Sequence, residues 1–241
     1  MTRAKLISRT KGNTSSAVMQ QRKEAPDSTD FYPTPLWATR ALIEHVLLKN
    51  EIPVGQQSVL EPACGYGFMS RPLNEYFAEV TSADAFIYGQ DTIRDFVNDP
   101  NAPESFDWVI TNPPFNLAAE FCINALSVAK IGIALFTRTA FVEGINRYSG
   151  IFSKTPPTYF AQFVERVPIV KGRLDDEAVS ATAYCWLVWI KARPAPPSQL
   201  IWIPPCRKAL DRPGDYDGPS KKQESRVVKP VGLISRLLGR K

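Results

Sequence analysis

Short apolar segments alternate with helical segments through the middle of the chain, and this alternation constrains the fold more than any other feature. The expected strands span residues 58–61, 79–84, 107–111, 131–137 and 183–190. The expected helices span residues 35–48, 68–77 and 117–129, the first with Thr34 as its N-cap and Pro35 in its first turn. This alternation predicts an α/β fold with a parallel or mostly parallel sheet covered on both faces. Ligands of such sheets bind at the carboxyl ends of the strands.

The two ends of the chain differ in charge from its middle. Residues 1–30 carry six basic and three acidic side chains, and residues 192–241 carry eleven and four. The residues between them carry 12 basic and 17 acidic side chains. The N-terminal part lacks apolar periodicity, and the chain after Lys191 is rich in proline, which interrupts helices and central strands. The sequence predicts a basic disordered tail at 1–29, a folded domain at 30–191 and an extended basic tail at 192–241.

Several classes of protein are disfavoured by the cysteines, the histidine and the apolar runs. The four cysteines show no paired spacing, and His45 is the single histidine. This set argues against a zinc site or a disulfide framework and is consistent with a reducing cytoplasm. The longest apolar run, residues 181–190, is too short to cross a bilayer, which takes about 20 residues, and the first residues do not resemble a signal peptide. We expect a cytoplasmic protein without a metal or a membrane span.

A glycine-containing loop, Glu61-Pro-Ala-Cys-Gly65-Tyr-Gly67, follows the first expected strand and precedes a helix. Glycine allows a sharp turn and close approach of a ligand to the backbone. A dinucleotide-binding loop would have a third glycine or alanine where this chain has Ser70. The carboxylate of Glu61 would also repel a pyrophosphate, whereas it would attract the sulfonium and ammonium of S-adenosylmethionine. Asp84, at the end of the second expected strand, is placed to accept two ribose hydroxyls.

The tetrapeptide Asn112-Pro113-Pro114-Phe115 follows the third expected strand and is the most specific motif in the chain. Its prolines fix two φ angles, remove two donors and hold Asn112 extended. The remaining polar atoms are acceptors, namely the Asn112 side-chain oxygen and the Pro113 carbonyl. Phe115 adds an aromatic face on which a base can stack. Two acceptors that hold the hydrogens of an aryl amine favour a localised lone pair on its nitrogen, so the motif is suited to reaction at a planar amine.

Together these motifs resemble those of the class I amino-group methyltransferases, most closely the small adenine-N6 DNA methyltransferases of phages and prophages. The resemblance covers about residues 30–191 and implies a Rossmann-like, mostly parallel doubly wound sheet. It implies methyl transfer from S-adenosylmethionine to DNA in a bacterial or phage-infected bacterial cell, with Asn112 to Phe115 as the catalytic residues. The implied cofactor-binding residues are Tyr32, Thr34, Pro35, Glu61, Ala63, Gly65, Gly67, Asp84, Asp95 and Phe96. Among these, Asp95-Phe96 is similar to the pair that flanks the cofactor adenine, and residues 31–35 resemble the motif that closes over its methionine end.

One departure from the family concerns recognition of the substrate. Only about 70 residues separate Phe115 from the last expected strand, which leaves no room for a large separate recognition domain. Residues 138–174 nevertheless hold six basic and two acidic side chains, interleaved with aromatic ones. Basic groups neutralise phosphates and aromatic groups stack beside a displaced base. The nucleic-acid contacts expected from this stretch are Arg138, Arg147, Lys154, Lys171 and Arg173.

Three alternatives remain open from the sequence. The same Asn-Pro-Pro-aromatic element occurs in enzymes that methylate RNA adenine or the side-chain amide of protein glutamine. A non-catalytic nucleic-acid-binding protein with a methyltransferase fold is a second alternative. A nicotinamide-dependent oxidoreductase is the weakest, because Glu61, Ser70 and the Asn-Pro-Pro-Phe motif all argue against it.

Overall fold

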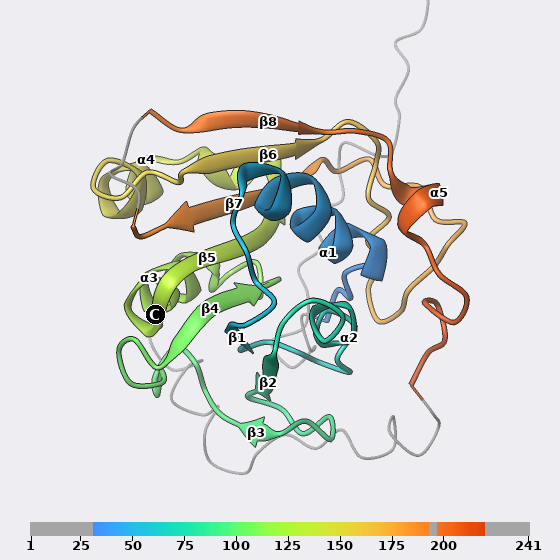
Figure 1. Ribbon diagram of the computed structural model, residues 1–241, viewed down its shortest axis with the longest axis horizontal. Helices are drawn as coiled ribbons and strands as arrows, with labels where there is room; N and C mark the ends of the chain where they lie inside the picture. The colour runs from blue at the N-terminus through green and yellow to red at the C-terminus, as the bar shows by residue number, and fades with distance from the viewer. Residues whose placement is uncertain (1–30, 193–196, 220–241) are drawn as a thin grey trace, which may run out of the picture.

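The structure is a computed structural model that describes residues 31–192 and 197–219. It contains an eight-stranded sheet with the strand order β3-β2-β1-β4-β5-β7-β6-β8 (Figure 1). The strands are β1 Ser58–Glu61, β2 Glu79–Asp84, β3 Thr92–Ile93, β4 Phe106–Thr111, β5 Ala129–Arg138, β6 Tyr159–Phe163, β7 Tyr184–Ile190 and β8 Gln199–Ile203. Paired strands are parallel except at β7, which runs antiparallel to β5 and β6. The predicted mostly parallel α/β sheet is confirmed.

The helical segments are α1 Leu36–Leu42, η2 Ile43–Leu47, η3 Leu48–Asn50, α2 Ser70–Leu73, α3 Ala118–Val128, η4 Thr139–Val142, α4 Ile145–Arg147, η5 Tyr148–Phe152 and α5 Arg207–Leu210. The helix expected at 35–48 is a continuous run through α1, η2 and η3. The helix expected at 68–77 is shorter, because Glu75 and Tyr76 donate to carbonyls three residues back and tighten the chain into turns after Leu73. None of the helices in the described part of the chain is long and apolar enough to span a membrane.

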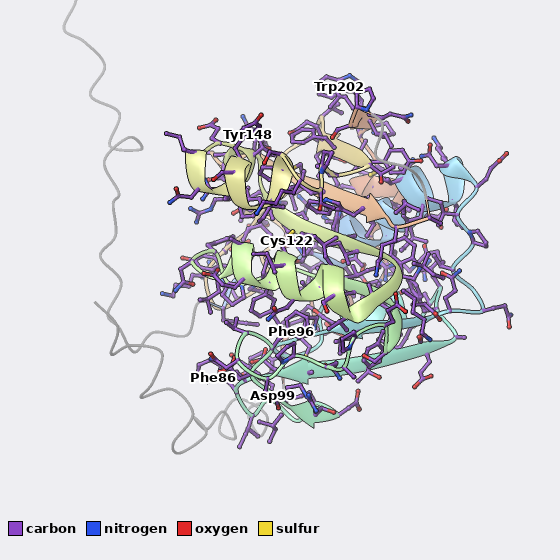
Figure 2. All side chains as sticks on the ribbon, turned by 90° about the vertical axis from the view of Figure 1, so that its left-hand side faces the viewer. Phe86, Phe96, Asp99, Cys122, Tyr148 and Trp202 are labelled. Atoms are coloured by element: carbon purple, nitrogen blue, oxygen red, sulfur yellow. The ribbon has the colours of Figure 1, made fainter. Side chains whose placement is uncertain are left out.

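Helices cover both faces of the sheet, and successive strand residues point to opposite faces. One core includes Trp108 of β4 and Trp186 of β7 and lies against α1. The other includes Val109 and Leu187 of the same two strands and lies against α3. Figure 2 views the α3 face, where Cys122 of α3 and Tyr148 of η5 are labelled. The doubly wound arrangement is therefore confirmed.

The described part of the chain after Ala192 differs from the expected extended tail. Residues 199–203 form β8, which pairs in parallel with β6, and residues 207–210 form α5. Prolines flank β8 but do not lie within it. In the described sheet β8 is an edge strand paired with β6, and proline is tolerated at the ends of edge strands. Ile203 is fully buried in the core beneath α1. The expected N-terminal tail at 1–29, residue 30, and residues 193–196 and 220–241 of the expected C-terminal tail lie outside the described residues.

A buried arginine joins α1 to this C-terminal segment. The guanidinium of Arg40 in α1 donates to both carboxylate oxygens of Glu75, to both of Asp215 and to the carbonyl of Leu210, at 2.5–3.2 Å. Only 2% of the Arg40 side chain is exposed. Burial alone would raise the pKa of Asp215, but the hydrogen bonds from Arg40 and from the Arg212 N–H hold that pKa below its usual range.

Candidate active site

A cavity of about 270 Å³ opens at the carboxyl ends of β1, β2 and β4. It lies where the strand order reverses, since β1 pairs with β2 on one side and with β4 on the other. This switch point is the expected ligand site of a doubly wound sheet. The volume is close to the lower end of the range for small-molecule pockets, about 300–1,000 Å³.

The glycine loop forms one wall of this cavity. Gly65 and Gly67 have φ angles of +51° and +79°, a conformation that side chains rarely adopt. The Gly65 N–H donates to a carboxylate oxygen of Asp84 at 2.9 Å, which ties the loop to the end of β2. The ring of Phe31 lies directly over Gly65, where an added Cβ would collide with Phe31 Cε2. Glycine at 65 is therefore favoured by the positive φ angle, and any larger residue would also displace the Phe31 ring.

Two buried carboxyl groups face this region. Burial raises the pKa of Glu61 to about 8, although Ser70 Oγ donates a hydrogen bond to it. Burial also raises the pKa of Asp84 to about 6, against the opposing effect of N–H groups of Phe86 and Gly65. Within residues 31–192 and 197–219, no ion pair neutralises either carboxyl group. The site therefore favours a positively charged ligand where these groups are ionised, which for Asp84 is above about pH 6 and for Glu61 above about pH 8.

Asn112, at the end of β4, is held by the segment that precedes α1. Its Nδ2 donates to the carbonyl of Tyr32 at 2.8 Å and to Thr34 Oγ1 at 3.0 Å. Its Oδ1 is buried and has no hydrogen-bond partner in the part of the chain that the structure describes. An unpaired buried acceptor is costly, and this one belongs to a residue that lines the cavity. It is therefore available to accept a hydrogen bond from a ligand.

Phe115 lies between two other side chains of the site. The ring of Tyr32 is 5.1 Å away, tilted by 44°. The guanidinium carbon of Arg138, at the end of β5, lies 4.0 Å from the centre of the Phe115 ring. Stacking of a guanidinium on an aromatic face is a favourable cation–π contact. Arg138 therefore connects the end of β5 to the Asn-Pro-Pro-Phe motif.

The structure brings most of the predicted site residues to the cavity. The lining includes Tyr32, Thr34, Glu61, Ala63, Asp84, Asp95, Phe96, Asn112, Pro113, Pro114 and Phe115. Gly65 and Gly67 shape the loop behind the lining, and Pro35 is the N-cap of α1. The expectation that Thr34 caps this helix is wrong, because its hydroxyl instead accepts from Asn112. The carboxylate of Asp95 accepts from the N–H groups of Val97 and Asn98.

Of the five basic residues expected to contact nucleic acid, only Arg138 is shown in contact with a cavity residue. Arg147 instead donates to the carbonyls of Phe141 and Glu143 and so stabilises its own loop. Arg173 forms an ion pair with Asp175 at 2.8 Å. Lys154 is exposed and Lys171 half-buried, and neither lines the cavity.

Sequence reasoning missed an aromatic cluster around Phe31. Tyr88 stacks on Phe31 with ring centres 5.8 Å apart, and Tyr66 contacts both rings edge-on. Phe86 and Tyr88 line the cavity from the loop after β2. Phe86 and Tyr88 follow closely after the strand that ends at Asp84. Because the carboxyl ends of parallel strands share one edge of the sheet, this position could have predicted that both residues lie at the site.

Comparisons with known proteins give a fold but no sequence family. The chain matches no protein-family model and no curated protein sequence. Among solved structures, the candidate RNA methyltransferase PH1948 from Pyrococcus horikoshii has a TM-score of 0.51 at 15% identity, over 68% of this chain and 89% of that one. The 23S rRNA methyltransferase ErmE has a TM-score of 0.43 at 17% identity, over 68% of this chain and 71% of that one.

A third structure of similar fold is the modification subunit of a candidate type I restriction enzyme from Vibrio vulnificus YJ016. Its TM-score is 0.49 at 14% identity, over 85% of this chain and 55% of that one, so the match spans about half of the subunit. The strand order and the similarity to PH1948 show that this chain has the Rossmann-like fold of the class I methyltransferases.

Proposed function

We propose that this protein transfers a methyl group from S-adenosylmethionine to the exocyclic N6 amino group of adenine in DNA. The observation that carries the proposal is Asn112, a lining residue of the cavity whose buried Oδ1 accepts from no described residue while its Nδ2 is already bound. Such an oxygen fits a ligand that donates hydrogens, as an amino group does.

The cavity fits the proposed cofactor in charge. Asp84, with a pKa of about 6, is mostly ionised at neutral pH, and Glu61, with a pKa of about 8, adds negative charge as the pH rises. When bound, S-adenosylmethionine supplies a methyl group on a positively charged sulfur, which makes that carbon electrophilic. The residues that would hold it are those of the lining on the β1 and β2 side, with Asp95 and Phe96 on the adjacent loop.

The chain's own residues would prepare the amine for attack. Asn112 Oδ1 and the Pro113 carbonyl accept the two amino hydrogens, which favours a localised lone pair on the nitrogen. Phe115 lines the cavity, and a base that stacks on its ring takes the place of the Arg138 guanidinium, a stacking contact worth about 1–3 kcal/mol. The base must first leave the duplex, which costs a few kcal/mol. Fixed placement of the amine then supplies most of the rate.

The surface after β5 supports a nucleic-acid substrate. Lys154 provides exposed positive charge for phosphates, and so does Arg138, whose side chain is exposed although its guanidinium also lies over the Phe115 ring. In the same stretch Ile145 is 86% exposed and Tyr148 is 65% exposed, on the helical segment labelled in Figure 2. Exposed apolar side chains beside positive charge are suited to insertion between base pairs.

The test uses S-adenosylmethionine with a radiolabelled methyl group, incubated in parallel with unmethylated DNA, total RNA and a protein extract. Digestion of each product identifies the modified residue. Label recovered as N6-methyladenine in DNA supports the proposal. Label recovered in RNA adenine or in protein glutamine would support methyl transfer to an amino or amide nitrogen but would show that DNA is not the substrate. Cofactor binding without transfer to any of the three substrates would favour a nucleic-acid-binding role.

We expect cofactor binding to depend on pH. Only the ionised forms of Asp84 and Glu61 attract a cation, and their pKa values are about 6 and about 8, so affinity should rise as the pH increases through this range. Between pH 5.5 and pH 7.5 an α-ammonium with a pKa of ~7.7–8.0 stays mostly charged, while the ionised fraction of Asp84 rises about fourfold, so the Kd should fall about fourfold from Asp84 alone and further as Glu61 ionises. Calorimetry at both pH values measures it.

The control for this pH dependence is Glu104→Gln, an exposed carboxylate that should leave the profile unchanged. Glu61→Gln should remove the rise in S-adenosylmethionine affinity near pH 8 and leave the rise near pH 6. Equal affinities at pH 5.5 and pH 7.5 for the wild type would contradict the assignment of these carboxyl groups to a cationic ligand.

A further inference from the structure

We propose that Thr34 is a positioning residue that fixes which end of the Asn112 amide faces the target amine. The inference rests on the proposed function and adds a residue that acts through Asn112. Its basis is the hydrogen bond from Asn112 Nδ2 to Thr34 Oγ1 at 3.0 Å, beside the bond to the Tyr32 carbonyl at 2.8 Å.

The orientation of the Asn112 amide needs such support. The two ends of an asparagine amide have nearly the same shape, and a half-turn exchanges the oxygen with the NH2 group. In the observed orientation Oδ1 is buried, and no residue among 31–192 and 197–219 bonds to the oxygen end. The half-turn would place NH2 donors against the donors of a target amine. Both hydrogens of Nδ2 are occupied by Tyr32 and Thr34, which makes the productive orientation the stable one.

Thr34 is a rigid point of attachment. It is 3% exposed and immediately precedes Pro35, the N-cap of α1. No side chain caps this helix, so the Thr34 hydroxyl is not used on α1. Leu36 and Trp37 are buried in the first turn, which anchors the helix to the core.

The residues before Thr34 extend this support across the cavity. Phe31 packs over Gly65 of the glycine loop, and its carbonyl accepts the Gly172 N–H at 2.9 Å. Tyr32 packs its ring near Phe115. Residues 31–34 therefore run from the glycine loop to Asn112. The segment that holds the Asn112 side-chain amide is itself packed against the glycine loop.

The test compares Thr34→Val, which keeps the shape but loses the hydroxyl, with Thr34→Ser, which keeps the hydroxyl. The substrate is genomic DNA from a strain without adenine methylation. Loss of one net hydrogen bond corresponds to about a fivefold to tenfold effect. We expect kcat to fall by that factor in Thr34→Val, with the KM for DNA and the Kd for S-adenosylmethionine changed less than twofold. Thr34→Ser should restore most of kcat.

Thr39→Val is the matched control. Thr39 lies in α1, is fully buried, and its hydroxyl has no hydrogen-bond partner. The same chemical change one helical turn away should therefore leave kcat unchanged. If Thr34→Val does not fold, Thr34→Ala gives the same comparison with a smaller side chain.

A second measurement does not depend on the identity of the substrate. The side-chain amide signal of Asn112 in a ¹⁵N NMR spectrum is assigned by its disappearance in Asn112→Asp. Its two hydrogens should exchange with solvent slowly in the wild type and about tenfold faster in Thr34→Val, because one hydrogen bond is lost.

The outcomes separate the two proposals. Wild-type kcat and an unchanged Asn112 signal in Thr34→Val would overturn the positioning role and leave the proposed function intact. Loss of S-adenosylmethionine binding in Thr34→Val would overturn it too, since Thr34 would then serve the cofactor. Wild-type transfer by Asn112→Ala would instead overturn the proposed function itself.

Discussion

Asn112→Ala is expected to transfer methyl groups about 10²–10³-fold more slowly than the wild type, the loss typical of removing one preorganised polar group from an active site. The variant removes the buried, unpaired Oδ1 of a residue that lines the cavity and leaves the glycine loop and both carboxyl groups in place. Binding of S-adenosylmethionine should therefore be nearly unchanged. Single-turnover assays with labelled cofactor measure the rate, and calorimetry measures the binding.

Two further variants make this result specific. Asn112→Asp keeps an acceptor oxygen at the cavity but loses the donors to Tyr32 and Thr34, so its activity should lie between the wild type and Asn112→Ala. Asn50→Ala removes an amide that donates to the Val46 carbonyl at the far end of the first helical run and should not alter the rate. A transfer rate for Asn112→Ala within threefold of the wild type would show that the amine is held elsewhere.

Arg40→Ala is expected to lower the free energy of unfolding by about 3–5 kcal/mol, the cost of breaking a buried ion pair by removing one partner. The change leaves Asp215 buried without its counter-charge and removes hydrogen bonds to Glu75 and Leu210. Urea unfolding gives the difference, provided that the m value is unchanged. Limited proteolysis should then cleave residues 211–217 more readily.

Arg173→Ala is the matched control, because Arg173 also forms an ion pair at 2.8 Å but its side chain is 66% exposed. Exposed pairs contribute about 0–1 kcal/mol, so this variant should unfold almost as the wild type does. Equal losses of the free energy of unfolding in Arg40→Ala and Arg173→Ala would mean that burial does not strengthen the contribution of the Arg40 ion pairs to stability. Acidification offers a second check. The pKa of Asp215 is held below its usual value of 3.8, so its contribution to stability is present above that pH and is lost as the pH falls below it.

The sequence predicted those parts of the fold whose signal is local. The strands at β1 and β2 have the expected bounds, and α3 begins and ends within a residue of the expected helix. The Glu61 loop and the Asn112 motif each follow a buried strand, and parallel strands bring their carboxyl ends to one edge. Their meeting at one cavity could therefore be expected before the structure was known.

Other features depend on contacts between distant residues. β8 is exposed at several positions and lies between prolines, so its composition resembles a tail, and only pairing with β6 makes it a strand. Thr34 precedes a proline at a helix start, which predicts a helix cap. Its hydroxyl instead accepts a hydrogen bond from Asn112, which lies 78 residues away in the sequence. Local patterns do not reveal such competition between partners.

The bond between Arg40 and Asp215 also sets an order of events during synthesis. The two residues are 175 positions apart, which at about 5–20 residues per second corresponds to roughly 10–35 s of translation. During that interval Arg40 can pair with Glu75 but not with Asp215, and β6 is made before its neighbour β8. This side of the domain is therefore completed last, and until β8 emerges a chaperone or a wrongly paired strand can reach the free edge of β6.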